Sequence, residues 1–185
     1  INGVDDDYDG FTDNFRGWDI AEMDNNPQVI SNENITNRFH GISVAGMALA
    51  TTDNGVGISG TAFKCKYLPL KIQEYSGALT AGYESLVYGA EHGCDVINCS
   101  WGNSVEEPFG QDIIDYVTNN FNTLIVAAAG NSNNEVLVYP ASFDKVLSVA
   151  ATNENDIRWE GSTYNYKVDI SAPGVNMYTT TDNSG

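Results

Sequence analysis

The chain alternates apolar segments with amphipathic ones, and this alternation limits the folds that it can adopt. Segments 94–102 (CDVINCSWG), 123–131 (TLIVAAAGN) and 145–152 (KVLSVAAT) have the apolar content of buried strands. Segments 78–93 and 109–121 repeat apolar residues at the spacing of helices that pack on one face. Apolar strands separated by helices are typical of a parallel sheet covered on both sides. The sequence therefore predicts a three-layer α/β/α domain around a mostly parallel sheet.

Weaker patterns complete this prediction. Residues 1–36 are polar and acidic and are expected to form a loop region, whereas 37–185 are expected to form the α/β core. No linker or repeat divides the chain, so one domain is expected. The other expected elements are a helix over 40–52 and strands over 16–20, 64–72, 167–171 and 175–181.

Composition excludes several classes of protein. Hydrophobic residues make up 42% of the 185 positions, which is too many for a disordered chain. The 25 acidic and 8 basic residues give a net charge of −17, which argues against nucleic acid and anionic membranes as partners. No apolar run approaches the roughly 18 residues of a membrane span, and the first residues lack the pattern of a signal peptide. The three cysteines are expected to be buried thiols.

One glycine motif resembles a cofactor fingerprint. The segment GVGISG at 55–60 matches G-x-G-x-x-G. In dinucleotide-binding proteins this motif follows a strand and opens a helix, whereas here a predicted helix precedes it and a predicted strand follows. We therefore interpret this segment as a loop whose glycines allow tight turns. A nucleotide-binding domain remains the least favoured functional class.

Three segments place a polar side chain where α/β proteins carry out chemistry. His40 opens a predicted helix, and Gly41 beside it would let another backbone come close. A predicted strand ends in Ser100–Gly102, where an exposed sheet edge can pair with an extended peptide. Another ends in Gly130 and Asn131, and a side-chain amide there can donate to a developing oxyanion.

Structural interpretations of the two histidines and of Asn131 are also open. A histidine at the start of a helix can be a packed core residue. Asn131 can be a turn residue after Gly130, since asparagine is favoured in turns. His92, at the end of a predicted helix, is interpreted as a structural residue near the helix dipole.

The same three segments, in the same order, resemble those of the subtilisin-like serine proteases (subtilases). FHGISVAG is similar to the family's His-Gly-Thr-x-Val-Ala-Gly, DVINCSWG to its Val-Ile-Asn-x-Ser-x-Gly, and IVAAAGNS to its Ala-Ala-Gly-Asn. Similar segments at 54–72, 138–152 and 168–180 extend the resemblance over nearly the whole chain. The resemblance implies a secreted or cell-surface endopeptidase that cleaves extended peptides by acyl transfer.

The resemblance also assigns roles to residues. It implies that His40 is the general base and that Asn131 donates to the oxyanion. The expected substrate-binding residues are Ser100, Trp101 and Gly102 on one wall of the specificity pocket, and Ala129 and Gly130 on the other.

The sequence departs from the subtilase pattern in two places. No Asp-Thr-Gly or Asp-Ser-Gly turn precedes His40, and no Gly-Thr-Ser-Met-Ala-like segment follows, since Ser184 lacks the flanking small residues. We therefore expect an interior piece of a protease domain, truncated at both ends and inactive alone. Apolar surface exposed by truncation would favour a homodimer. A pseudoprotease that binds proteins without cleaving them remains the alternative function.

The acidic N-terminal segment DDDYDGFTD predicts a metal site. Oxygen ligands at alternating positions around a glycine suit Ca²⁺. The segment is not an EF-hand, because Arg16 stands where the twelfth position requires glutamate. Subtilases often bind calcium, and a merely solvated acidic loop is the alternative. The predicted ligands are Asp5, Asp7, Asp9 and Asp13.

Overall fold

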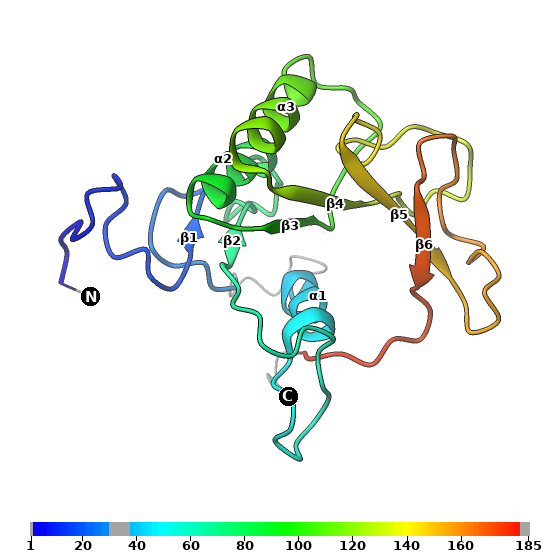
Figure 1. Cartoon of the computed structure of the whole chain (residues 1–185), viewed down its shortest axis with the longest axis horizontal. Coiled ribbons are helices and arrows are strands. Elements are labelled where there is room, and N and C mark those ends of the chain that lie inside the picture. Colours follow the sequence, from blue (N-terminus) through cyan, green and yellow to red (C-terminus); the bar gives the residue numbers. More distant parts are fainter. Residues whose placement is uncertain (1, 30–37, 182–185) are drawn as a thin grey trace. The chain divides into compact units, whose positions relative to one another are not determined.

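The structure is a computed structural model that describes residues 2–29 and 38–181. The chain forms two compact units: Ile1–Ser85 with Tyr178–Gly185, and Leu86–Met177. In chain order the elements are β1 (Trp18–Asp19), α1 (His40–Leu49), β2 (Leu70–Lys71), α2 (Gly82–Glu91), β3 (Val96–Cys99), α3 (Gly110–Phe121), β4 (Leu124–Ala128), β5 (Val146–Thr152) and β6 (Ile170–Pro173) (Figure 1).

The first unit contains a short parallel ladder and helix α1. In this ladder Trp18 pairs with Leu70, and Asp19 pairs with Lys71. The Asp19 carboxylate and the Lys71 ammonium also form an ion pair, with side chains only 3% and 13% exposed. A buried charge requires such a partner, and this pair joins the two strands at the position where Asp19 and Lys71 pair.

The chain that follows α1 folds back along the end of the helix. The N–H groups of Gly60 and Ala62 donate to the carbonyls of Ala50 and Ala48 at 2.9 and 2.8 Å. These bonds satisfy carbonyls that the end of a helix leaves without intrahelical donors. The GVGISG segment thus lies in a loop between α1 and β2, which confirms that it lacks the order of a dinucleotide fingerprint.

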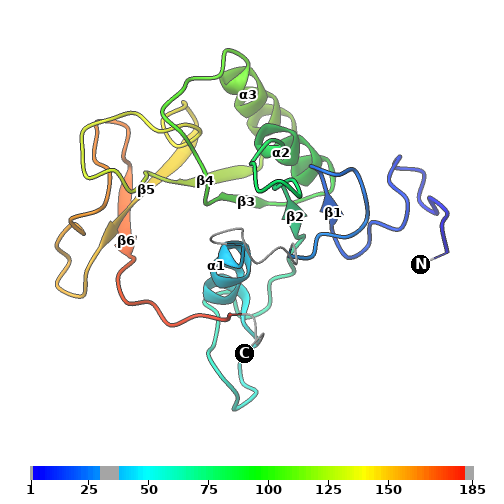
Figure 2. The ribbon, with the colours of Figure 1, turned by 180° about the vertical axis from the view of Figure 1, so that it is seen from behind.

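The second unit is built on a four-stranded sheet. Its strands follow the order β3-β4-β5-β6 and all three pairings are parallel. Helix α3 lies between β3 and β4 in the chain and packs against β4; Figure 2 shows it, with α2, on one side of these two strands. The fully buried side chains of this unit include Leu86, Cys99, Ile114, Val117 and Ile125, which form its core.

Most predicted elements are confirmed in place and type, but several are shorter than predicted. Of the predicted strand at 64–72, only Leu70–Lys71 pairs with another strand. Pro69 has no N–H to donate to a ladder, and its carbonyl instead accepts from Trp18 N at 3.1 Å. The predicted strand at 175–181 is wrong: this segment forms none, and its hydroxyls bond to helix α1 instead.

Two further findings concern residue classes. The expectation of three buried thiols holds only for Cys99, since Cys65 is exposed and Cys94 is half-buried; all three are free. Burial raises the pKa of the Cys99 thiol to about 12. Among the described residues, no helix combines the length and apolar character needed to cross a bilayer.

Candidate functional site

The carboxyl ends of β3 and β4 form the edge of the sheet where the predicted substrate-binding segments begin. Cys99, the last residue of β3, pairs in parallel with Ala127 near the end of β4. Residues 100–102 and 129–131 therefore leave the sheet at the same edge (Figure 1). Open α/β sheets bind ligands at this edge. The structure thus brings both predicted walls of the specificity pocket together within the second unit.

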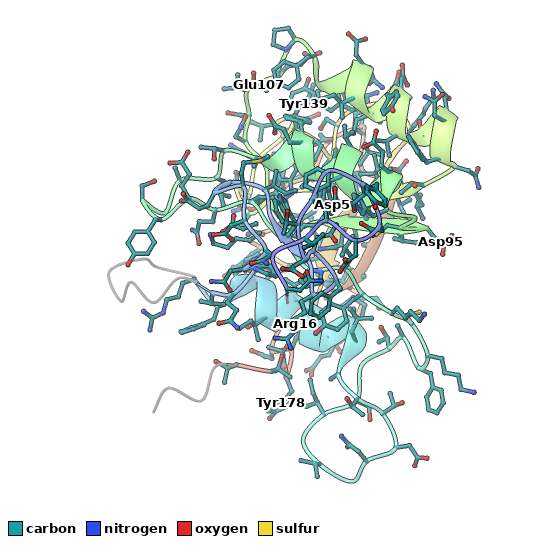
Figure 3. All side chains as sticks on the ribbon, turned by 90° about the vertical axis from the view of Figure 1, so that its left-hand side faces the viewer. Asp5, Arg16, Asp95, Glu107, Tyr139 and Tyr178 are labelled. Atoms are coloured by element: carbon teal, nitrogen blue, oxygen red, sulfur yellow. The ribbon has the colours of Figure 1, made fainter. Side chains whose placement is uncertain are left out.

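Hydrogen bonds hold the segment that follows β3. The Asn98 side-chain amide donates to Ser100 Oγ at 2.9 Å. Asn103 and Tyr139 exchange two backbone hydrogen bonds: the Asn103 N–H donates to the Tyr139 carbonyl at 3.1 Å, and the Tyr139 N–H donates to the Asn103 carbonyl at 2.8 Å. Tyr139, labelled in Figure 3, also donates its hydroxyl to Glu106 at 3.1 Å. These bonds leave Gly102 exposed beside an ordered backbone.

Val138 separates the two walls. A Cβ atom added to Gly102 would lie 3.0 Å from one Val138 methyl, and a Cβ added to Gly130 would lie 3.0 Å from the other. Both distances are shorter than ordinary van der Waals contacts, so Val138 packs closely against both glycines. Val138 itself is buried. Its two methyl groups therefore fill the space between the predicted walls.

Asn131 follows β4 on an exposed turn. Gly130 has a φ of +109°, a conformation that residues with a Cβ rarely adopt. Ala129 is buried, and its N–H donates to the Val149 carbonyl of β5 at 2.9 Å. The Asn131 side chain is exposed, and within the described part of the chain it makes no hydrogen bond. Its amide N–H groups are thus available to a ligand.

A second segment, residues 158–164, pairs with the Asn131 turn. The Thr163 N–H donates to the Gly130 carbonyl at 2.9 Å, and the Ser132 N–H donates to Thr163 Oγ1 at 3.0 Å. The Asn133 N–H continues the pairing by donating to the Gly161 carbonyl at 3.0 Å. Thr163 is fully buried. The turn that carries Asn131 is therefore bonded along its length to the 158–164 segment.

His40 is the first residue of α1, in the other unit. It is exposed, and Phe39 before it provides no side-chain cap. Gly41 was expected to allow close approach of another backbone, yet a Cβ there would meet nothing within 4 Å in the described chain. The close approach occurs at Gly46 instead, where a Cβ would lie 2.9 Å from Thr179 Oγ1 and from Thr180 Cβ.

The threonines after Met177 hold the first turns of α1. Thr180 Oγ1 donates to the Ile42 carbonyl at 2.9 Å, and Ser43 Oγ donates to the Thr180 carbonyl at 3.2 Å. The Thr179 hydroxyl donates to the Ser43 carbonyl. Hydroxyl groups that bond backbone in this way replace the sheet ladder predicted for 175–181.

His92 has the structural role that was predicted. Its Nδ1 lies 2.7 Å from the Tyr88 carbonyl, and its ring stacks on the Tyr88 ring with centroids 3.8 Å apart. Ser184 lies outside the described residues.

Three of the four predicted metal ligands come together. Asp5, Asp7 and Asp9 each place a carboxylate oxygen within 4.8 Å of the others. Asp13 does not belong to this group: its two oxygens accept from the Asn2 and Gly3 N–H groups at 3.1 and 2.7 Å. The Gly3 bond, and then the Asn2 bond, lower the pKa of the Asp13 carboxyl.

Asp5 is the candidate metal ligand that has a buried carboxylate oxygen without a hydrogen-bond partner among the described residues. Its Oδ2 accepts from the Gly10 N–H at 2.9 Å, while its Oδ1 is buried and has no hydrogen-bond partner in the described part of the chain. A buried oxygen without a donor is costly. A cation would satisfy this atom and reduce the repulsion among the three carboxylates. The residues present therefore fit a hard divalent ion such as Ca²⁺.

Two residues of this edge were missed by the sequence analysis. Val138 lies in the connection between β4 and β5, and Thr163 lies in the connection between β5 and β6. In such connections no helical or strand periodicity of apolar residues distinguishes one valine or threonine from another. Only the fold brings Thr163 to the turn that carries Asn131, because 31 residues separate Ser132 from it.

Known proteins resemble this chain in sequence. The family model described as "Subtilase family" matches residues 3–185. Thermitase from Thermoactinomyces vulgaris is 37% identical over 166 residues, which are 89% of this chain and 57% of thermitase. The cell wall-associated protease of Bacillus subtilis is 35% identical over 149 residues, which are 80% of this chain and 16% of that protein.

A solved structure of a protease from Pseudoalteromonas arctica also matches. Its TM-score is 0.68 at 31% identity, and the match covers 73% of this chain and 43% of that one. The chain thus spans about half the length of thermitase and less of the other two proteins. These likenesses confirm the predicted subtilisin-like α/β/α fold with a mostly parallel sheet. The chain belongs to the subtilase family.

Proposed function

We propose that this chain is the part of a serine endopeptidase that binds an extended peptide and stabilises the oxyanion formed during its cleavage. The observation that carries the proposal is the shared edge of β3 and β4, where Ser100–Gly102 lies opposite Ala129–Asn131. The exposed backbone at Gly102, beside the hydrogen-bonded Asn103, supports pairing with a substrate strand. The exposed Asn131 amide supplies donors next to it.

In the proposed reaction a serine hydroxyl attacks the scissile carbonyl and forms an acyl-enzyme, which water then hydrolyses. His40 takes the proton of the hydroxyl and returns it to the leaving amine. The Asn131 amide donates to the oxyanion of each tetrahedral intermediate. Ser100–Gly102 holds the substrate backbone, while Ala129 and Gly130 bound the pocket for its side chain.

The test is peptide hydrolysis by the protein encoded by the complete gene, with His40→Ala and Asn131→Ala beside the wild type. Loss of an oxyanion donor lowers kcat by about 10² to 10³ with little change in KM. Loss of the base leaves only the residual rate that binding and the oxyanion donors provide. Asn119→Ala, in helix α3, is the control and retains full activity.

Peptide binding without cleavage by the wild type would instead support the pseudoprotease. We further propose that residues 1–185 alone do not cleave peptides, because they contain neither an Asp-Thr-Gly-type turn nor a Gly-Thr-Ser segment. Cleavage by this piece, abolished by His40→Ala, would refute that statement.

We also propose that the Asp5, Asp7 and Asp9 carboxylates bind Ca²⁺. The proposal is supported by their spacing within 4.8 Å and by the buried, unpartnered Oδ1 of Asp5. Ca²⁺ that binds the folded state stabilises it by RT ln(1 + [Ca²⁺]/Kd), so the melting temperature rises with the Ca²⁺ concentration. Adding Ca²⁺ should therefore raise the Tm of the wild type but not that of Asp5→Asn. Asp112→Asn, with the same charge change on α3, should respond like the wild type.

Finally, we propose that the protein acts outside the cell, as the name of the cell wall-associated protease of Bacillus subtilis indicates for that relative. Immunodetection in the medium and at the surface of the producing cells, compared with their cytosol, tests this location. A purely cytosolic signal would contradict it.

A further inference from the structure

Thr163 bonds to the peptide groups on both sides of Asn131. Its N–H donates to the Gly130 carbonyl at 2.9 Å, and its Oγ1 accepts from the Ser132 N–H at 3.0 Å. The Gly130 carbonyl lies in the peptide plane that contains Asn131 N, and the Ser132 N–H lies in the plane that contains the Asn131 carbonyl. Because each peptide unit is planar, fixing one atom pair in each plane restricts the backbone torsions of Asn131.

The Asn131 side chain is exposed and makes no hydrogen bond within the described residues, so the direction of its amide depends on the backbone that carries it. The pairing also cannot move easily, because Thr163 is fully buried and a Cβ at Gly130 would lie 2.9 Å from Thr163 Oγ1. An oxyanion donor stabilises a transition state only when it is already aimed at the developing charge.

We propose that Thr163 is a positioning residue, which acts on catalysis by fixing the backbone of Asn131. This proposal rests on the proposed function of Asn131 as an oxyanion donor. Thr163 itself contacts no substrate. The Ser132 N–H lies beyond the end of β4 and has no acceptor in the sheet. The Thr163 hydroxyl accepts its hydrogen bond instead.

The neighbouring residue provides a matched control. Ser162 is also fully buried, and its Oγ accepts a backbone N–H at the same 3.0 Å, but from Ala151 in β5. Ser162→Ala removes this hydrogen bond and also the one that Ser162 Oγ donates to the Thr163 carbonyl at 3.3 Å, but it leaves both bonds of Thr163 to the Asn131 turn in place. A merely structural role for Thr163 predicts equal effects of the two variants on activity.

The experiment measures kcat, KM and Tm for the protein encoded by the complete gene. Thr163→Val keeps the shape and the backbone N–H but removes the acceptor, and we expect kcat to fall about tenfold, less than when a donor is itself removed. KM should stay within about twofold. Thr163→Ser restores the acceptor and should restore kcat, while Ser162→Ala should lower Tm and leave kcat unchanged.

A double-mutant cycle with Asn131→Ala separates the two proposals. If Thr163 acts through Asn131, Thr163→Val should lower kcat by less than about twofold once Asn131 is alanine. An equal effect in both backgrounds, or a wild-type kcat for Thr163→Val, overturns the positioning role while Asn131 keeps its own. If Asn131→Ala leaves kcat unchanged, the oxyanion function and the positioning role both fail.

A measurement on the wild type keeps the proposal testable even if Thr163→Val does not fold. The Ser132 N–H lies in an exposed turn and should nevertheless exchange with solvent at least about tenfold more slowly than an unbonded amide, because Thr163 Oγ1 accepts it. The Asn131 N–H, for which no bond is present among the described residues, is the internal reference. Equal exchange of the two amides overturns the proposal.

Discussion

We predict that Val138 limits the size of the substrate side chain. Its two methyl groups approach Gly102 and Gly130, the predicted walls of the specificity pocket, and each would lie 3.0 Å from a Cβ on its glycine. Val138→Ala removes both methyl groups and leaves the walls unchanged. We therefore predict that this variant accepts larger side chains on the amino side of the cleaved bond.

The magnitude follows from the two carbon atoms removed. Burying a methylene group is worth about 0.8 kcal/mol, so two additional buried carbons contribute about 1.6 kcal/mol. This free energy corresponds to roughly a fifteenfold change in kcat/KM, since about 1.4 kcal/mol is tenfold. The preference for Leu over Ala at this substrate position should rise by about that factor. Removing the buried methyl groups should also lower the free energy of unfolding by about 2 kcal/mol.

The assay compares kcat/KM for peptides that differ only in the residue before the cleaved bond, with Ala, Val, Leu and Phe at that position. Val146→Ala is the matched control, because Val146 is equally buried but lies in β5, in the sheet. It should lose similar stability without any change in preference. An unchanged Leu-to-Ala ratio in Val138→Ala, with the protein folded, would refute the placement of Val138 between the pocket walls.

Three further predictions concern the fold and its thiols. Lys71→Met leaves the Asp19 carboxylate buried without its partner, and urea unfolding should show a loss of about 3 to 5 kcal/mol; wild-type stability would contradict the ion pair. Gly130→Ala places a Cβ at a φ of +109°, so calorimetry should show a loss of at least about 1 to 3 kcal/mol, and an unchanged Tm would exclude this conformation. At pH 8 a thiol of pKa about 12, such as that of Cys99, is ionised in only about one molecule in 10⁴. A thiol reagent should therefore label the exposed Cys65 well before the buried Cys99, and the rate at which Cys99 is labelled should rise with pH.

The sequence predicted the elements whose apolar period is strong. Helix α3 and strand β5 lie almost where they were expected, because each buries one regular set of side chains. The short strand β2 and the segment at 175–181 were predicted less well. In both places the backbone bonds to groups that only the tertiary fold supplies, such as the Ser43 hydroxyl, which donates to the Thr180 carbonyl.

The candidate site divides in the same way. Asn131 and Gly102 could be found because each ends an apolar strand that resembles a subtilase segment. Val138 and Thr163 could not, because nothing in a linear pattern distinguishes a valine or threonine that faces a functional turn from one that only packs. The acidic loop was predicted from spacing, yet the structure assigns Asp13 to backbone N–H groups rather than to the carboxylate group.

The two turns at the sheet edge are stabilised by the same arrangement. The backbone N–H and C=O groups of a strand in a parallel sheet bond to the neighbouring strand. The residues that follow the carboxyl end of the strand have no such neighbour and need other donors and acceptors. The turn after β3 finds them at Tyr139, in the connection that leaves β4. The turn after β4 finds them at Gly161 and Thr163, in the connection that leaves β5. Because the strands are parallel and in sequence order, each connection leaves the sheet beside the turn of the preceding strand. The topology of the sheet therefore supplies the partners that keep this edge ordered. We predict that substitutions of the residues that bond to these turns, such as Thr163, affect catalysis, whereas substitutions elsewhere in the same connections do not.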